Sequence, residues 1–169
     1  MRLFTLSANL VAAIFVISLL LAATCGANTV SAQDQSAADA ILLEKLKADK
    51  KLMVADRMEL SDDEARGFWP IYDSYQKDLH FLDIRLMKTI QDYADAYNNN
   101  NLTDKLAVQL SEELIAIEED EAKLRKAYLL KLVGVLPGRM AARYLQIENN
   151  LRALLRYELA DGIPLMGSN

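Results

Sequence analysis

The sequence contains little of the residue types on which most catalytic and metal sites depend. Cys25 is the only cysteine and His80 the only histidine among 169 residues. Lys77, instead of a glutamate, lies three residues before His80, so the Glu-x-x-His motif of di-iron helical bundles is absent. No glycine-rich phosphate loop is present either. We therefore predict no catalytic residue, no cofactor and no metal site, and we expect His80 to be a surface or partly buried side chain.

The N-terminal segment has the order of parts that is typical of a secretory signal peptide. A basic start at Arg2 is followed by an apolar run from Leu10 to Ala23, and small residues end the segment at Val30-Ser31-Ala32. Cleavage after Ala32 would remove Cys25 together with this run. We therefore predict a signal peptide at 1–32 and a periplasmic protein without cysteine, in which a haem attachment motif, a zinc knuckle and a thiol nucleophile are excluded.

Two other fates of this segment are open. Lipidation of Cys25 would make a lipoprotein, but Thr24 occupies the preceding position, where glycine or alanine is preferred. An uncleaved segment would act as an anchor. The apolar run is shorter than the roughly 20 residues that a bilayer-spanning helix needs, which favours cleavage and release without membrane insertion.

The charge balance is acidic. The formal net charge is −5, and Arg2 is the only charged residue before Gln33, so cleavage makes the remainder more negative. This total gives no electrostatic reason to expect nucleic acid or an anionic membrane surface as a partner. The remaining segment, 33–169, has the usual size of a single domain. Without disulfides, it must be stabilised by packing alone.

The pattern of apolar residues predicts an all-α fold of four helices and no strand. Ser61-Asp62-Asp63-Glu64 forms a capping box, Thr103 is a plausible cap for a later helix, and Gly162 and Pro164 stop the last one. Two of these helices are long and joined by a short polar loop, so we expect an elongated molecule built on a long antiparallel helical hairpin with two flanking helices. The predicted helices are Ala37–Met58, Asp62 to the Asn98–Asn101 loop, Thr103 to about Val135, and Pro137-Gly138 to Gly162.

Charges along the third predicted helix change sign. Seven acidic residues and one lysine lie between Asp104 and Glu121, and only cations follow before Val135. Glu119–Lys123 and Glu121–Arg125 have the spacing of favourable ion pairs. The acidic run Glu118–Glu121 could attract a cation, but consecutive helical residues point in different directions, so we predict a solvated charged face. The arginines of the last helix do not form one basic stripe, because Arg139 and Arg143 lie almost opposite Arg152 and Arg156.

Aromatic residues gather near Pro70, which lies inside the second predicted helix and predicts a kink near Gly67 to Pro70. Two interpretations of these rings are open. They could form an exposed protein-contact site, or they could close the core where the helices diverge. The candidate protein-contact residues are Phe68, Trp69, Tyr72 and Tyr144.

Several short motifs resemble those of a known family. The order of a signal peptide, a helix, Leu60-Ser61-Asp62-Asp63-Glu64, a long hairpin and Leu136-Pro137 before a final helix is similar to the Spy and CpxP type of periplasmic stress proteins, the LTxxQ family. Phe68-Trp69-Pro70-Ile71-Tyr72, Leu124-Arg125-Lys126-Ala127-Tyr128 and Gln146-Ile147-Glu148-Asn149 look like an uncharacterised exported branch related to that family. The resemblance implies a helical, cradle-like homodimer that binds unfolded or misfolded envelope proteins without ATP.

These observations lead to a functional hypothesis and an alternative. The first is an ATP-independent periplasmic chaperone and stress-response protein that binds unfolded clients through an apolar helical face. The alternative is an adaptor that docks on the sensor domain of a membrane-bound kinase and modulates envelope-stress signalling. An enzyme is disfavoured, because no set of side chains forms an acid, base and nucleophile group.

Overall fold

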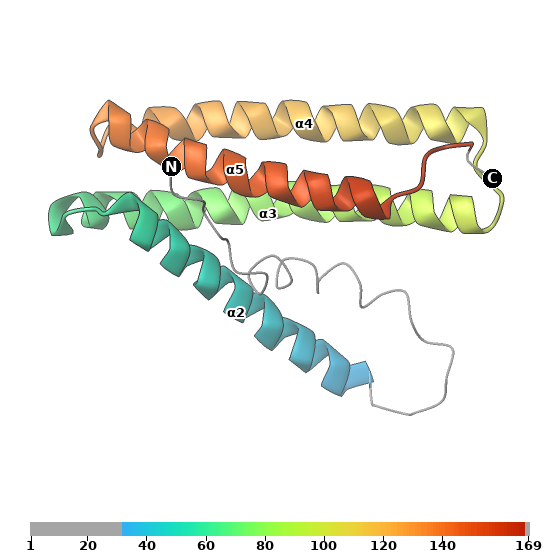
Figure 1. Cartoon of the computed structure of the whole chain (residues 1–169), viewed down its shortest axis with the longest axis horizontal. Helices are drawn as coiled ribbons and strands as arrows, with labels where there is room; N and C mark the ends of the chain where they lie inside the picture. The colour runs from blue at the N-terminus through green and yellow to red at the C-terminus, as the bar shows by residue number, and fades with distance from the viewer. Residues whose placement is uncertain (1–31, 168–169) are drawn as a thin grey trace, which may run out of the picture. The chain divides into compact units, whose positions relative to one another are not determined.

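The computed structural model describes residues 32–167, and every regular element in this range is an α-helix (Figure 1). The helices are α2 (Ala32–Met58), α3 (Asp62–Asn98), α4 (Asp104–Leu132) and α5 (Gly138–Gly162). The predicted all-α fold of four helices is thus confirmed. Except for Ala32, the predicted signal peptide, including Cys25, lies outside the described residues.

Helix α2 begins earlier than predicted. It starts at Ala32 instead of Ala37, so the polar residues Gln33–Ser36 are helical. No glycine or proline lies in this stretch to stop the helix from extending toward the N-terminus. Helix α2 up to Arg57 belongs to one compact unit, and the later helices, from Met58 onward, form a second unit. Each unit is described by itself.

The second unit is a bundle of three helices. Helices α3 and α4 run antiparallel and are joined by the short segment 99–103, and α5 packs along α4 (Figure 1). The predicted hairpin is therefore present, and α5 flanks it as expected. Its core is made of large apolar and aromatic residues from all three helices and the α4–α5 turn: Phe68, Tyr72, Tyr75, Leu79, Leu82, Tyr93, Leu110, Ile117, Tyr128, Leu132, Leu136, Tyr144 and Ile147.

Both predicted caps are formed. The Ser61 side chain accepts from the Glu64 backbone N–H at 3.4 Å, and the Glu64 carboxylate accepts from the Ser61 backbone N–H at 3.0 Å. The Thr103 hydroxyl accepts from the Leu106 backbone N–H at 3.2 Å. These contacts satisfy backbone donors that a helix start would otherwise leave unpaired. Local sequence therefore sets both helix starts.

Pro70 lies inside α3, which is continuous from Asp62 to Asn98. Proline has no backbone N–H, so it cannot donate to the carbonyl four residues earlier. The Ser74 hydroxyl donates to the Pro70 carbonyl at 2.9 Å, a separate contact within the same helix. The helix is not interrupted at Pro70, and the kink near Gly67 to Pro70 stays a prediction. One turn earlier, a Cβ atom on Gly67 would lie 3.0 Å from Cβ of Val135, so glycine permits the turn after α4 to approach α3 closely.

Helix α4 is shorter than predicted. It ends at Leu132, and Val135 lies in the following turn with 39% of its surface exposed. The backbone N–H of Leu136 donates to the carbonyl of Leu132 at 2.8 Å and completes the turn before Pro137. Val135 is therefore not part of the helical core stripe.

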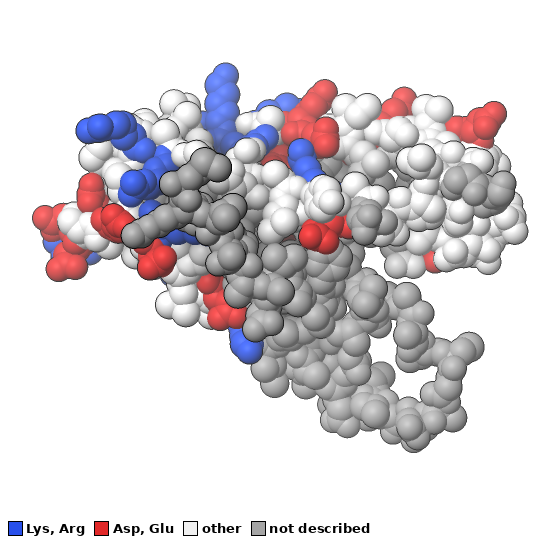
Figure 2. Space-filling view, in the orientation of Figure 1, with Lys and Arg blue, Asp and Glu red and all other residues white. Residues whose placement is uncertain are grey.

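The predicted change of charge along α4 is visible on the surface. Figure 2 shows Lys and Arg side chains gathered at the end where α4 joins α5, whereas Asp and Glu side chains follow along α4 toward its start. The two predicted ion pairs are also present: Lys123 Nζ lies 3.8 Å from Glu119 Oε2, and Arg125 Nε lies 4.0 Å from Glu121 Oε1.

Candidate functional site

A cluster of six aromatic rings occupies the bundle near the α4–α5 turn. We call Phe68, Trp69, Tyr72, Tyr75, Tyr128 and Tyr144 the aromatic cluster. The ring centroids of Phe68 and Tyr144 are 5.1 Å apart, and those of Tyr75 and Tyr128 are 5.2 Å apart, both edge-to-face. Tyr75 also lies 6.0 Å from Tyr144. Edge-to-face contacts at these separations add to the stabilisation that burial of the rings provides.

The four candidate protein-contact residues all belong to the aromatic cluster. Phe68 and Tyr144 are fully buried and Tyr72 is 3% exposed, whereas Trp69 is half-buried. This burial favours the interpretation of these rings as core. Tyr75 and Tyr128 were not predicted as members, although both lie on the apolar stripes of their helices, because sequence spacing does not show which residues of two helices meet.

Buried polar groups adjoin the cluster. Glu148 is fully buried, and its Oε1 accepts from Gln76 Nε2 at 2.9 Å and lies 3.2 Å from the Tyr144 hydroxyl. Burial, and then the charge of Glu148, raise the pKa of Tyr144 far above its usual value. Tyr128 donates to Asp78 at 2.5 Å, and burial followed by this hydrogen bond raises the pKa of Tyr128 to about 12. These hydroxyls are therefore donors that stay protonated.

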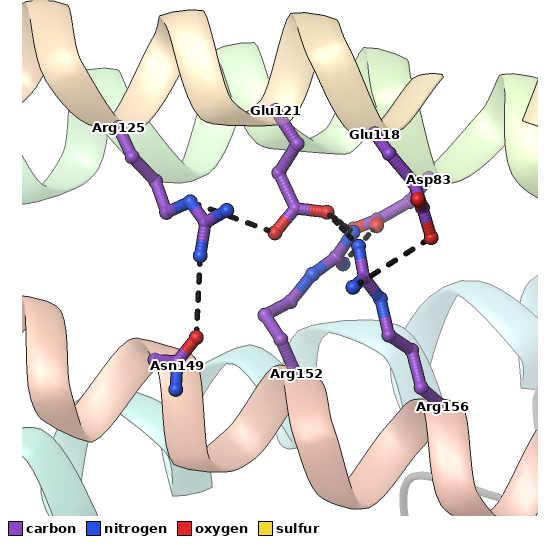
Figure 3. Close-up of polar contacts among 7 residues, drawn as sticks. All are labelled: Asp83, Glu118, Glu121, Arg125, Asn149, Arg152 and Arg156. Atoms are coloured by element: carbon purple, nitrogen blue, oxygen red, sulfur yellow. Dashed lines mark hydrogen bonds and ion pairs between the residues drawn. The ribbon is translucent and has the colours of Figure 1, made fainter. Parts of the chain in front are cut away.

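A second polar site lies where α4 faces α5. We call Asp83, Glu121, Arg125, Arg152 and Arg156 the buried charge network (Figure 3). Arg152 Nη2 donates to Glu121 Oε2 at 2.7 Å, and Arg156 Nη2 donates to the same oxygen at 3.2 Å. Arg152 Nη1 donates to Asp83 of α3. One arginine of α5 thus binds carboxylates from both helices of the hairpin.

The two central groups of the buried charge network are largely removed from water. The side chain of Glu121 is 1% exposed and that of Arg152 is 8% exposed. Burial by itself would raise the pKa of Glu121, but the hydrogen bond from Arg152 and the charges of the three arginines outweigh it and lower that pKa. Burial would likewise lower the pKa of Arg152, but Glu121 and Asp83 raise it. Both groups are therefore held in their charged forms.

This network contradicts one prediction and agrees with another. The acidic run Glu118–Glu121 was expected to be a solvated face, but Glu121 is buried, because it lies on the same side of α4 as Ile117 and Tyr128. The arginines of α5 were not expected to form one basic stripe, and Arg139 and Arg143 do lie outside the network. Arg152 and Arg156, however, converge on Glu121. The only signal of this site in the sequence was Glu121 itself, a charged residue on the face of α4 where apolar residues recur every three or four positions.

Neither a metal-binding cluster nor a membrane-spanning helix is found among the described residues. No three His, Cys, Asp or Glu side chains come together to hold a metal ion in the part of the chain that the structure describes. His80 is exposed, as predicted. None of the helices within residues 32–167 has the length and apolar composition needed to cross a membrane.

Comparison with known proteins gives no relative. No protein-family model, curated protein or solved structure matches the chain. The resemblance to Spy and CpxP proteins therefore stays a prediction based on short motifs.

The lowered pKa of Glu121 makes stability depend on pH. Because its pKa is below the usual 4.5 in the folded state, the unfolded chain binds more protons between the two values. The contribution of Glu121 is therefore fully present above about pH 4.5 and is lost as pH falls through the folded pKa. We expect the free energy of unfolding, measured by urea titration at several pH values, to fall below this pH. In Glu121→Gln the fall is smaller; an identical pH dependence in the variant would contradict this assignment.

Proposed function

We propose that this protein is an ATP-independent chaperone that binds unfolded proteins through apolar side chains on the outer surface of its helical hairpin. The observation that supports this most directly is the exposure of four large apolar residues. Phe81 and Ile84 on α3 are 57% and 53% exposed, and Val108 and Ile115 on α4 are 56% and 58% exposed. We call these four residues the exposed apolar set.

Spacing places these residues in pairs. Phe81 and Ile84 are three residues apart and Val108 and Ile115 are seven apart, so each pair shares one face of its helix. Isolated exposed apolar residues are common on protein surfaces, whereas contiguous apolar patches mark surfaces that bind other proteins. Each pair therefore offers a small apolar strip.

Charges flank both strips. Lys77 lies four residues before Phe81, and Lys88 lies four after Ile84. Glu112 and Glu119 lie four residues after Val108 and Ile115. A charged rim keeps apolar patches soluble and limits the area that a client covers, so binding is weak and reversible. This arrangement suits a protein that holds and releases unfolded chains without ATP.

The signal-peptide pattern at 1–32 and the resemblance to Spy and CpxP proteins support two further parts of the proposal. They are location in the periplasm and assembly as a homodimer. Light scattering of the purified protein would measure its mass directly, and a monomeric mass at all concentrations would remove the dimer from the proposal.

The test is suppression of aggregation. The protein at stoichiometric amounts should suppress light scattering from several unrelated, chemically unfolded proteins as they are diluted into buffer. Replacing the exposed apolar set with serine should remove most of this effect, because little buried area is changed but the client loses its apolar contacts. Tyr157→Ser on α5, where the ring is 72% exposed, is the matched control and should suppress like the unmodified protein.

Two outcomes would contradict this proposal. Absence of suppression by the unmodified protein would exclude a general chaperone, and full suppression by the serine variant would exclude the exposed apolar set. An adaptor for a sensor kinase would instead bind one membrane protein with fixed stoichiometry and leave unrelated unfolded proteins unaffected.

A further inference from the structure

The joined ends of α4 and α5 concentrate positive charge in an otherwise acidic protein. From Ala122 to Ile147 the sequence has six cations and no acidic residue: Lys123, Arg125, Lys126, Lys131, Arg139 and Arg143. Helix α4 ends at Leu132 and α5 begins at Gly138, so these cations lie around one turn of the bundle. Figure 2 shows the resulting group of Lys and Arg side chains.

Three of these cations are available to a partner. Lys123 pairs with Asp120 at 3.1 Å, Arg125 contacts Glu121 and Asn149, and Lys131 lies over the Tyr128 ring at 3.8 Å. The other three are exposed and form no ion pair with any residue that the structure describes: Lys126, Arg139 and Arg143. Arg139 and Arg143 are four residues apart and share one face of α5.

Exposed aliphatic side chains lie among these cations. Leu130 is 68% exposed near the end of α4, and Val133 and Val135 in the following turn are 47% and 39% exposed. Together with Lys126, Arg139 and Arg143, these residues form what we call the basic tip. It combines apolar side chains at a turn with cations on both adjoining helices.

The acidic residues nearest to the basic tip are at the start of α3, which the turn approaches through the contact of Gly67 with Val135. They are Asp62, Asp63 and Glu64, and Glu59 lies two residues before the Ser61 cap. Asp63 pairs with Arg66, and the Glu64 carboxylate binds Ser61. Asp62 is exposed. The hydrogen bond to Ser61 leaves Glu64 charged, so three acids at this end form no ion pair with a described residue: Glu59, Asp62 and Glu64. Four exposed cations at the turn form none either: Lys126, Lys131, Arg139 and Arg143. The local charge is therefore opposite in sign to that of the whole chain.

We propose that the basic tip docks the protein on an anionic lipid surface. Cations near such a surface are attracted to its phosphate headgroups, and exposed aliphatic side chains gain free energy by entering the boundary between headgroups and acyl chains. A nucleic acid would satisfy the cations but would leave the aliphatic side chains without an apolar medium, and an acidic protein would need apolar side chains placed to match this one turn. An anionic lipid surface offers phosphates to the cations and an apolar medium to the aliphatic side chains. The negative net charge of the whole chain gave no reason to expect such a surface, but the local positive charge of the basic tip does. The proposal does not depend on the chaperone activity.

The test is co-sedimentation of the full chain with vesicles of phosphatidylcholine alone or of phosphatidylcholine with phosphatidylglycerol. The neutral vesicles measure any binding through the apolar segment Leu10–Ala23, and the difference between the two vesicle types measures the basic tip. We expect tighter binding to the anionic vesicles, with an affinity that falls as salt is added.

Two variants and a control locate the contact. Lys126→Gln, Arg139→Gln and Arg143→Gln together should weaken binding to anionic vesicles on the order of a hundredfold, at about fivefold for each cation. Leu130→Ser with Val133→Ser should weaken it further at high salt, where apolar contacts dominate. Lys77→Gln, Lys88→Gln and Lys105→Gln remove the same charge elsewhere and should leave binding nearly unchanged, and circular dichroism checks that all variants fold.

Several results would overturn the proposal. Equal binding to neutral and anionic vesicles would exclude a role for the cations, and an equal loss in the control variant would show an effect of net charge alone. Tighter binding to polyglutamate or to duplex DNA than to anionic vesicles would identify the basic tip as a site for an acidic protein or a nucleic acid.

Discussion

Replacing Glu121 with alanine is expected to lower the free energy of unfolding by about 3–5 kcal/mol. Glu121 is 1% exposed and accepts hydrogen bonds from both Arg152 and Arg156. Without it, the guanidinium of Arg152 stays buried with Asp83 as its one remaining carboxylate partner. The large cost comes from leaving this buried charge with only one of its two carboxylate partners more than from the loss of attraction. Equilibrium unfolding in urea measures the difference.

Two comparisons test the cause. Glu119→Ala removes a carboxylate that is 65% exposed on the same helix, and we expect a change of about 0.5 kcal/mol or less. Replacing Glu121 and Arg152 together with leucine removes the pair without leaving a buried charge, and the double variant should be more stable than Glu121→Ala. A loss of less than about 1 kcal/mol in Glu121→Ala would contradict the role of the buried charge network.

Tyr144→Ala is the second substitution with a large expected effect, about 3–5 kcal/mol of lost stability. Tyr144 is fully buried, and its ring packs edge-to-face on those of Phe68, Tyr72 and Tyr75. Truncation leaves a cavity in the centre of the aromatic cluster, and Glu148 loses a polar neighbour. Thermal or urea unfolding measures the effect.

The hydroxyl and the ring of Tyr144 can be separated by experiment. Tyr144→Phe keeps the ring and removes only the contacts with Gln76 and Glu148, so we expect a smaller loss of about 1–2 kcal/mol. Tyr157→Ala on the same helix removes a ring that is 72% exposed and should change stability by about 0.5 kcal/mol or less. Equal losses in Tyr144→Ala and Tyr157→Ala would show that burial of Tyr144 does not stabilise the bundle.

Most of the fold could be predicted because its signals are local. The capping box at Ser61 and Glu64 sets the start of α3, and the hydroxyl of Thr103 sets the start of α4. Both act within three residues along the chain, so the sequence alone contains the interacting groups. The exceptions were helix ends without such signals: α2 extends beyond Ala37, and α4 stops before Val135.

The candidate sites were predicted less completely because they join residues that are far apart in sequence. Phe68, Trp69, Tyr72 and Tyr144 were identified as a group, but spacing could not distinguish a contact surface from a core. The structure shows that three of them are buried. The exposed apolar set could not be identified from the sequence for the same reason. The period of a helix shows which residues share a face, but it does not show which face another helix covers.

The sequence by itself determined the helices, their caps and the change of charge along α4, because each depends on residues three or four positions apart. Only the tertiary structure determined that Glu121 is buried and paired with arginines. On an isolated α4 its carboxylate would be solvated, as the acidic run suggested. Packing of α5 against the hairpin removes Glu121 from water and brings Arg152 and Arg156 to it from more than 30 residues away. The sequence gives the sign of each charge. The free-energy cost of burying a charge, and the opposite charges that offset it, depend on which helices pack together.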